Sequence, residues 1–222
     1  MTTSSSAASR DGGGDIESEI RAVGIVPVVV LDDAADAQPL AAALAAGGLP
    51  IAEVTFRTDA ARDAIATMAA DPRMLVGAGT VLTIEQVDQA AEAGARFVVS
   101  PGFSDAVVRH CRDLGIPVFP GVATAGEVQR AFEAGLRTVK FFPAEASGGL
   151  PALKAIAGPF AMMRFIPTGG IGADSAGNYL RHPAVVAVGG SWMVARTLVT
   201  EGRFDEITRL AAEAVSAAAA AR

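Results

Sequence analysis

Eight short apolar runs, rich in β-forming residues, recur at near-equal spacing along this 222-residue chain, and the repeat limits the folds open to it. Successive runs start 20 to 26 residues apart, with alanine-rich segments of helical spacing between them, such as 34–46, 60–70 and 84–93. The runs begin near Ile25, Ile51, Met74, Phe97, Pro117, Thr138, Arg164 and Val185. Eight even strand–helix units without an insertion predict a single-domain (β/α)8 barrel of the α/β class, the TIM-barrel architecture. A doubly wound open sheet is the alternative, but such sheets rarely use eight units this even.

Signals at the helix ends agree with these boundaries. Glycine accommodates the left-handed backbone that ends many helices, and Ser or Thr side chains cap helix N-termini. The closing glycines are Gly47, Gly94, Gly115 and Gly135, and the candidate caps are Thr83, Ser104 and Thr124. A final helix over 205–221 is expected to close the ring. We therefore assign residues 16–222 to the barrel domain. Residues 1–15 are rich in Ser, Ala and Gly, lack the apolar segment of a secretory signal, and are predicted to form a disordered leader.

Composition narrows the classes of function. The formal net charge is −6 and no basic cluster occurs, so nucleic acid is not an expected partner. The longest apolar stretch, residues 24–31, is far shorter than the roughly 20 residues that span a bilayer, so no membrane contact is expected. Cys111 is the only cysteine, so the chain cannot form an internal disulfide. His110 and His182 are the only histidines, which are too few for a histidine-based zinc site. We expect Cys111 to pack in a helix of a cytoplasmic protein that needs neither metal nor cofactor.

Lys140, one of only two lysines, lies in the apolar sequence Thr-Val-Lys-Phe-Phe-Pro at 138–143, a predicted strand. Burying an ammonium is costly, because burial disfavours the charged form. A partly neutral lysine is a nucleophile toward carbonyl carbons and can form a Schiff base. The alternative is a strand-end lysine whose amine reaches water. The other lysine, Lys154, falls in an amphipathic helical stretch at 150–156 and is expected to face solvent.

The second predicted strand carries polar residues at alternate positions, in the sequence Ile-Ala-Glu-Val-Thr-Phe-Arg at 51–57. Because side chains alternate along a strand, Glu53, Thr55 and Arg57 share one face, and the apolar residues share the other. The apolar face suits the helix layer, which directs the polar face into the barrel. Glu53 is then a candidate for proton transfer and Arg57 for binding a substrate carboxylate. A structural ion pair between Glu53 and Arg57 is the alternative.

The same alternation directs Lys140 of the sixth strand into the barrel, where it shares the interior with Glu53. The pair offers an amine to bind a ketone and a base to move protons around it. A neighbouring carboxylate favours the ammonium and opposes the effect of burial, so the sequence leaves the protonation state of the amine open.

Small residues follow four of the predicted strands. Gly77-Ala78-Gly79-Thr80 ends the third and Ser100-Pro101-Gly102 ends the fourth, where backbone can approach a ligand and Thr80 can donate a hydroxyl, although both segments suit ordinary turns. Thr168-Gly169-Gly170 follows the seventh strand and Gly189-Gly190-Ser191 ends the eighth. In such barrels the loops after strands seven and eight recurrently bind phosphate. We therefore predict a phosphate-bearing ligand, with tight turns alone as the alternative.

Taken together, these segments resemble the 2-keto-3-deoxy-6-phosphogluconate (KDPG) aldolases, class I pyruvate aldolases of the Entner–Doudoroff route. The resemblance runs from about Ile20 to Ala214 and is specific because six motifs recur in the same order and spacing. The motifs are Glu53-Val54-Thr55-Phe56-Arg57, Gly77-Ala78-Gly79-Thr80, Ser100-Pro101-Gly102, Lys140-Phe141-Phe142-Pro143-Ala144-Glu145, Pro167-Thr168-Gly169-Gly170-Ile171 and Gly189-Gly190-Ser191-Trp192.

The resemblance implies a (β/α)8 homotrimer that reversibly cleaves KDPG to pyruvate and glyceraldehyde 3-phosphate without a metal. It makes Lys140 the Schiff-base residue and Glu53 the proton-shuttling residue. The other matched positions fall into two groups: Arg57, Thr80, Pro101 and Phe142 around the pyruvyl carboxylate and pocket, and Thr168, Gly169, Gly170, Gly190 and Ser191 at the distal, phosphate-binding end. The chemistry agrees, since a protonated imine accepts the electrons released when the C3–C4 bond breaks.

Two residues depart from those common in the family. Phe56 stands where leucine is common in the family, and only local repacking against the helices is expected. Gly172 stands where serine is common, which removes a hydroxyl near the phosphate end.

Other functions stay open. Relatives acting on 4-hydroxy-2-oxoglutarate or on 2-keto-3-deoxy-6-phosphogalactonate share the lysine chemistry. A phosphosugar isomerase or synthase would use Lys140 as an acid or phosphate contact. A non-catalytic barrel that binds a phosphorylated metabolite is disfavoured by the intact Glu53 and Lys140 set.

Overall fold

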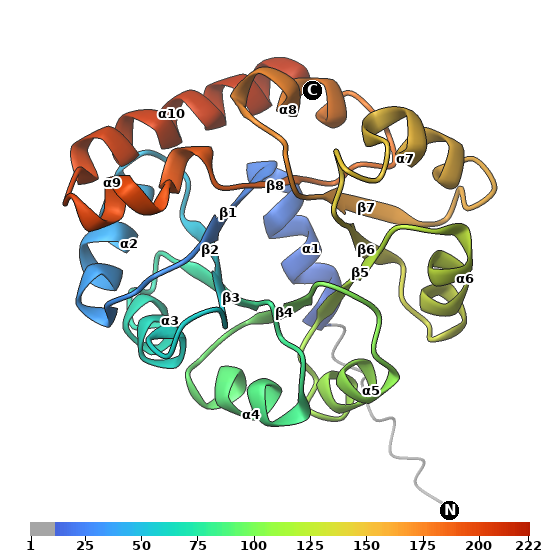
Figure 1. Cartoon of the computed structure of the whole chain (residues 1–222), viewed down its shortest axis with the longest axis horizontal. Helices are drawn as coiled ribbons and strands as arrows, with labels where there is room; N and C mark the ends of the chain where they lie inside the picture. The colour runs from blue at the N-terminus through green and yellow to red at the C-terminus, as the bar shows by residue number, and fades with distance from the viewer. Residues whose placement is uncertain (1–11) are drawn as a thin grey trace, which may run out of the picture.

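The computed structural model describes residues 12–222, in which eight parallel strands form a ring enclosed by helices (Figure 1). The strands are β1 (Ile25–Val29), β2 (Ile51–Thr55), β3 (Leu75–Gly79), β4 (Phe97–Ser100), β5 (Val118–Val122), β6 (Thr138–Phe141), β7 (Arg164–Pro167) and β8 (Val188–Gly190). They hydrogen-bond in the order β7-β6-β5-β4-β3-β2-β1-β8. The predicted single-domain (β/α)8 barrel is thereby confirmed.

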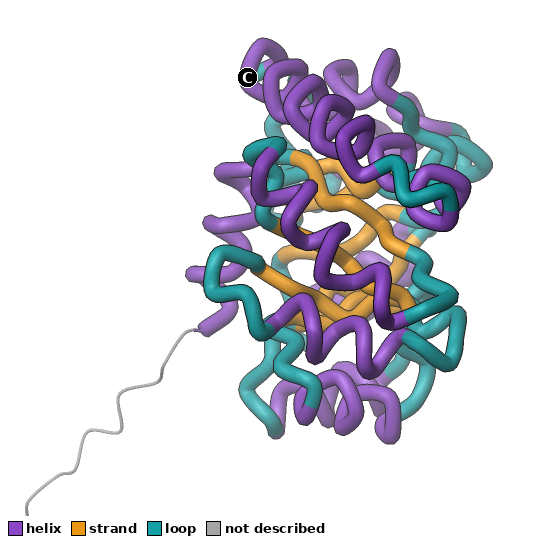
Figure 2. Tube along the Cα trace, turned by 90° about the vertical axis from the view of Figure 1, so that its left-hand side faces the viewer, coloured by secondary structure: helices purple, strands orange, loops and turns teal. Residues whose placement is uncertain are grey.

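Helices alternate with the strands and cover the outside of the ring (Figure 2). The α-helices are α1 (Gly12–Val23), α2 (Ala37–Ala46), α3 (Ala61–Ala69), α4 (Ile84–Glu92), α5 (Asp105–Asp113), α6 (Ala125–Glu133), α7 (Gly149–Ala157), α8 (Ala173–Leu180), α9 (Arg196–Thr200) and α10 (Phe204–Ala221). Short 3-10 helices, η1 (Ala34–Asp36) and η2 (Trp192–Val194), precede α2 and follow β8. Within residues 12–222, no helix combines the length and apolar character of a transmembrane span.

The barrel closes through the eighth apolar run, which is shared between two neighbouring strands. Val185 forms a bridge with Phe165 of β7, and the Val186 N–H donates to the Phe165 carbonyl over 3.0 Å. The chain then crosses to β1, where Val188 pairs with Ile25. The regular strand β8 therefore starts three residues later than the predicted start at Val185. The run thus lies between β7 and β1 and bonds to both, since Gly189 bridges to Thr168 just beyond β7 and also pairs with Val26 of β1.

Helix α1 lies across the ring at the N-terminal end of the barrel strands (Figure 1). Ile16 and Ile20 are buried, and the Thr138 hydroxyl at the start of β6 donates to Glu17 over 2.6 Å. This helix begins at Gly12, four residues before the predicted start of the barrel domain. The rest of the predicted leader, residues 1–11, lies outside the described residues. Helix α1 therefore forms the floor of the barrel.

The predicted helix caps are confirmed. Thr83, Ser104 and Thr124 adopt extended backbone conformations, and each side chain accepts a hydrogen bond from the N–H three residues later. At Thr124 the Glu127 carboxylate also accepts from the Thr124 N–H over 3.0 Å, which completes a reciprocal capping box. These local bonds fix where α4, α5 and α6 begin.

The side chain of Cys111 packs from helix α5 into the core, as expected, so its thiol can report unfolding. It is fully buried, and burial raises the pKa of its thiol to about 12. Because the thiolate is the reactive form, we expect a chromogenic disulfide reagent at pH 8 to leave the native protein unlabelled. The same reagent should label one thiol per chain in denaturant. Rapid stoichiometric labelling of the native protein would contradict this packing.

Candidate active site

Two charged side chains meet inside the barrel. Lys140 projects from β6 and Glu53 from β2, strands that stand four places apart in the order of eight and so face each other. The Lys140 Nζ lies 3.0 Å from Glu53 Oε1, and the two side chains are 7% and 4% exposed. A buried ion pair is costly to desolvate, and hydrophobic residues of similar volume often stabilise a fold as well or better. The pair is therefore weak evidence for a stabilising role and good evidence for a chemical one.

Below this pair the interior is apolar and almost filled. A cavity of about 10 Å³ is lined by the pair and by Ile20, Val26, Phe97, Val99, Phe119 and Ile166. This volume is close to the minimum that holds one water molecule, about 10–15 Å³. Ile20 closes it from helix α1, a contribution that sequence reasoning missed because α1 meets the strands only in the tertiary structure. A substrate must therefore approach Lys140 from the opposite, C-terminal mouth of the barrel.

Glycine at the end of β3 makes room for Glu53. A methyl group added at Gly79 would lie 2.4 Å from Glu53 Oε1, so any larger residue would displace the carboxylate. The next residue, Thr80, has φ of 56° and is the one non-glycine residue with positive φ among residues 12–222. Such strained conformations persist where the surroundings impose them, and they cluster at functional sites. This supports the assignment of Thr80 to the site.

Phe142 and Pro101 directly follow the C-terminal ends of β6 and β4. The Lys140 Nζ is 5.1 Å from the centre of the Phe142 ring, and Phe142 is half-buried. Pro101 directly follows β4, and its carbonyl packs so closely on Gly121 of β5 that a methyl group there would lie 2.0 Å away. Phe142 thus borders the amine directly, whereas Pro101 shapes the mouth through its backbone.

The structure does not bring Arg57 to Glu53. Strand β2 ends at Thr55, so the alternation of side chains no longer governs Arg57, which is exposed. It borders a hollow of about 420 Å³ together with residues of α3 and α4. The alternative of a structural Glu53–Arg57 ion pair is excluded, because the Glu53 carboxylate pairs with Lys140 instead.

The glycine-rich loops after β7 and β8 lie side by side. Thr168 bridges to Gly189, and a methyl group on Gly189 would lie 2.2 Å from the Thr168 hydroxyl oxygen. Gly169 and Gly170 have φ of 104° and 78°, which other residues rarely adopt. Gly190 is buried against the Trp192 ring, and Ser191 next to it is exposed. The predicted distal residues thus form one cluster, built largely of backbone.

Similarity to known proteins agrees with this geometry. Residues 16–210 match the family model of the KDPG and KHG aldolases, where KHG stands for 4-hydroxy-2-oxoglutarate. The chain belongs to this family. The 2-dehydro-3-deoxy-phosphogluconate aldolase of Treponema pallidum is 50% identical over 189 residues, which cover 85% of this chain and 90% of that relative.

Two solved aldolase structures superpose closely on the barrel. The 2-keto-3-deoxy-6-phosphogluconate aldolase of Zymomonas mobilis ZM4 with 3-phosphoglycerate has a TM-score of 0.85 at 47% identity, covering 91% of this chain and 95% of that one. The KDPG aldolase of Legionella pneumophila, with pyruvate captured as a covalent carbinolamine intermediate, has a TM-score of 0.85 at 41% identity, covering 88% and 96%. These two aldolases thus share most of the described barrel with this chain.

The two departures from common aldolase residues are absorbed locally. Phe56 is half-buried and packs against the hydrophobic core, and the expectation that it causes only local repacking stays a prediction. Gly172 caps helix α8, and its N–H donates to the Ser175 hydroxyl over 3.1 Å. Ser175 therefore keeps a hydroxyl at the start of α8 where the usual serine is missing.

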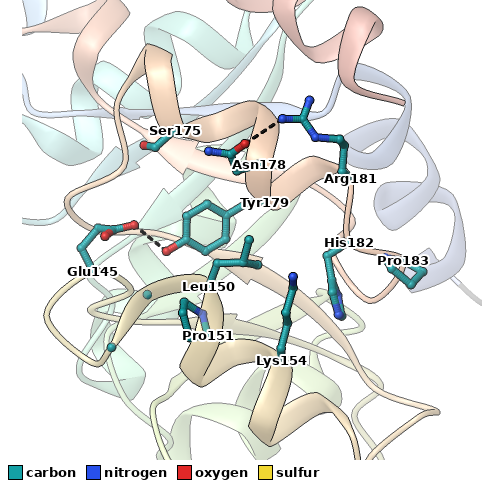
Figure 3. Close-up of a pocket in the computed structure, with 12 residues that line it drawn as sticks. Glu145, Leu150, Pro151, Lys154, Ser175, Asn178, Tyr179, Arg181, His182 and Pro183 are labelled. Carbon is teal, nitrogen blue, oxygen red and sulfur yellow. Dashed lines mark hydrogen bonds between the residues drawn. The ribbon is translucent and has the colours of Figure 1, made fainter.

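A hollow of about 790 Å³ lies outside the barrel between α7 and α8 (Figure 3). None of the predicted site residues borders it. Exposed Lys154 points into it, which confirms that this lysine lies apart from the buried pair. Glu145 and Tyr179 meet at its edge, and neither was predicted to have a role, although Glu145 ends the Lys140 motif and Tyr179 is the only tyrosine.

Proposed function

We propose that this aldolase reversibly cleaves KDPG to pyruvate and glyceraldehyde 3-phosphate through a Schiff base on Lys140. The observation that carries the proposal is the buried Lys140–Glu53 pair, which places an amine 3.0 Å from a carboxylate in an apolar barrel interior. The carbinolamine captured in the Legionella pneumophila relative supports the same chemistry, since a carbinolamine forms when an amine adds to a ketone.

The covalent stage begins when the Lys140 ammonium gives a proton to Glu53 and the free amine attacks C2 of the substrate. The resulting carbinolamine loses its hydroxyl as water, with a proton supplied by Glu53, and becomes a protonated imine. The apolar floor around Ile20 leaves room for about one water molecule at most beneath the amine. Water therefore reaches the imine only from the mouth of the barrel.

The cleavage stage uses the same two groups. Glu53 removes the proton of the C4 hydroxyl, the C3–C4 bond breaks, and its electron pair moves into the imine to give an enamine. Glyceraldehyde 3-phosphate leaves with its new aldehyde. Glu53 then returns the proton to C3, and water releases pyruvate from Lys140. One carboxylate can serve all these steps because proton gain and loss alternate along the path.

The remaining site residues take the roles that the family resemblance implies. Arg57 and Thr80 bind the pyruvyl carboxylate, and Pro101 and Phe142 line the pyruvyl pocket. The distal end is formed by Thr168, Gly169, Gly170, Gly190 and Ser191. The 3-phosphoglycerate bound by the Zymomonas mobilis relative supports a phosphate site in such a barrel. We further expect a cytoplasmic homotrimer that requires no metal, as the resemblance implies.

A second candidate substrate is 4-hydroxy-2-oxoglutarate, because the family description names both KDPG and KHG aldolases. The two aldols present the same ketone to Lys140 and differ at the distal end, where only KDPG carries a phosphate. A charge-assisted hydrogen bond contributes roughly 1.5–3 kcal/mol, so the phosphate should raise kcat/KM at least about tenfold.

Turnover of three aldols tests this assignment. Pyruvate release from KDPG, its galactonate epimer and 4-hydroxy-2-oxoglutarate is measured through coupled NADH oxidation by lactate dehydrogenase. We expect the highest kcat/KM for KDPG. Preference for the phosphate-free aldol would assign the chain to the second function, and absence of turnover with all three would refute aldol cleavage.

A further inference from the structure

The loop that follows Lys140 is tied to the loop that follows β7. Beyond the ends of these strands, the Ala144 N–H donates to the Thr168 carbonyl over 2.8 Å, and the Glu145 N–H donates to the Gly169 carbonyl over 3.0 Å. The pairing of β6 with β7 thus continues into the loops. A shift of Ala144 and Glu145 would therefore move Thr168 and Gly169 with them.

The Glu145 side chain is held between two glycines. A methyl group added at Gly170 would lie 2.8 Å from Glu145 Cβ, and one at Gly149 would lie 3.3 Å from Glu145 Oε2. Both glycines have positive φ, of 78° and 63°. The backbone of Gly170 therefore rests directly on the Glu145 side chain, and the position of one depends on the other.

Tyr179 fixes the far end of this side chain. Its hydroxyl donates to Glu145 Oε1 over 2.5 Å, and its ring is 1% exposed in helix α8 (Figure 3). Burial, followed by the neighbouring Glu145 carboxylate, raises the pKa of Tyr179 well above its usual value. The phenol is therefore a permanent donor across physiological pH. A hydrogen bond to a charged acceptor is stronger than one between neutral groups.

Helix α8 is also the helix that the Gly169–Gly170 loop enters. Its first residue is Ala173, and Tyr179 lies near its other end, at the hollow between α7 and α8. Glu145, in the loop that follows Lys140, therefore contacts α8 at two places. It accepts the hydrogen bond from Tyr179 near the end of the helix, and it packs against Gly170 in the loop that leads into the helix. No predicted substrate-binding residue takes part in the bond itself.

We propose that Tyr179 is a positioning residue whose hydrogen bond to Glu145 holds the loop after β6 against Gly170, and thereby sets the position of the distal site for the substrate phosphate. This inference rests on the proposed function, because it assigns the phosphate of KDPG to the loop at 168–170. Tyr179 and Glu145 touch neither the amine nor the reacting carbons.

The variant Tyr179→Phe tests the inference. Phenylalanine keeps the buried ring and removes only the hydroxyl, so the melting temperature and circular dichroism should stay close to those of the wild type. We expect KM for KDPG to rise roughly five- to tenfold, which is less than the loss of a charge-assisted hydrogen bond to the phosphate itself would cause, because Tyr179 acts on the phosphate site only through the loop. The values of kcat, KM for phosphate-free 4-hydroxy-2-oxoglutarate and borohydride-trapped pyruvate should stay within about twofold of the wild type, because the Lys140–Glu53 pair is untouched.

Four further variants distinguish a positioning role of Tyr179 from a general loosening of the fold. Glu145→Gln keeps an amide oxygen that accepts from the phenol but loses the charge, so KM for KDPG should rise less than in Glu145→Ala. Glu145→Ala should match Tyr179→Phe, and the double variant should be no worse than either. Asn178→Ala removes a neighbouring bond, from Arg181 at 2.7 Å, that touches neither loop, and it should change nothing. Competitive inhibition by inorganic phosphate should weaken in parallel with the KM changes.

The outcomes distinguish this inference from the function on which it rests. An unchanged KM for KDPG in folded Tyr179→Phe, with active wild-type enzyme, would overturn the positioning role alone. An equal rise in KM for the phosphate-free aldol would overturn it as well, since the effect would not concern the phosphate. Wild-type protein that fails to cleave KDPG would overturn the proposed function and this inference with it.

Discussion

Lys140→Arg is expected to abolish aldol cleavage, lowering kcat/KM for KDPG by more than roughly 10⁴-fold, as for loss of a covalent nucleophile elsewhere. Arginine stays protonated and cannot add to the ketone. It does keep a positive charge beside Glu53, whereas a neutral residue would leave that buried carboxylate unpaired, at about 3–5 kcal/mol. Coupled pyruvate release measures the loss, and circular dichroism establishes that the fold is intact.

The chain contains its own matched control for this variant. Lys154 is the only other lysine and lies exposed on helix α7, at the hollow outside the barrel (Figure 3). Lys154→Arg should therefore keep kcat and KM within about twofold of the wild type, as for ordinary surface changes. Comparable losses in the two folded variants would remove Lys140 from its assigned role.

Glu53→Gln should separate imine formation from proton transfer. Glutamine is close to isosteric, and its amide oxygen can still accept a hydrogen bond from the Lys140 amine at the observed 3.0 Å. It cannot take up or return a proton, so cleavage should slow by about 10²–10⁴-fold, the usual contribution of general acid–base catalysis. Pyruvate should still be trapped on Lys140 by borohydride, at a reduced rate.

The two measurements on Glu53→Gln must diverge if this account is right. Coupled pyruvate release reports cleavage, and intact-protein mass spectrometry after borohydride reports the imine. Turnover at the wild-type rate would take Glu53 out of the mechanism. Loss of both activities, with the melting temperature unchanged, would show instead that no other group can replace Glu53 in the proton transfers that form the imine.

The barrel was predictable because its determinants are local. Side-chain alternation placed Glu53 and Lys140 inside, and the caps at Thr83, Ser104 and Thr124 are set by neighbouring residues. The same reasoning fails for Arg57, since strand β2 ends two residues earlier and alternation no longer applies. Local signals thus locate a side chain only while the regular element continues.

Features that join distant segments were not predictable from the sequence. The floor formed by Ile20, the bonding of the eighth run to both β7 and β1, and the Tyr179–Glu145 bond each depend on how separate elements meet. Residues 145 and 179 are 34 positions apart and carry no shared motif. They meet only because helix α8 packs beside the loop after β6.

The most direct test of the account is to locate the pyruvate adduct. The protein is incubated with pyruvate and sodium borohydride and digested with trypsin, which does not cleave after a modified lysine. An adduct on Lys140 gives a modified peptide spanning residues 138–154, whereas an adduct on Lys154 gives one spanning residues 141–164. The account predicts modified peptide 138–154 alone. Folded protein that yields no adduct, or one only in peptide 141–164, would contradict Schiff-base chemistry at Lys140.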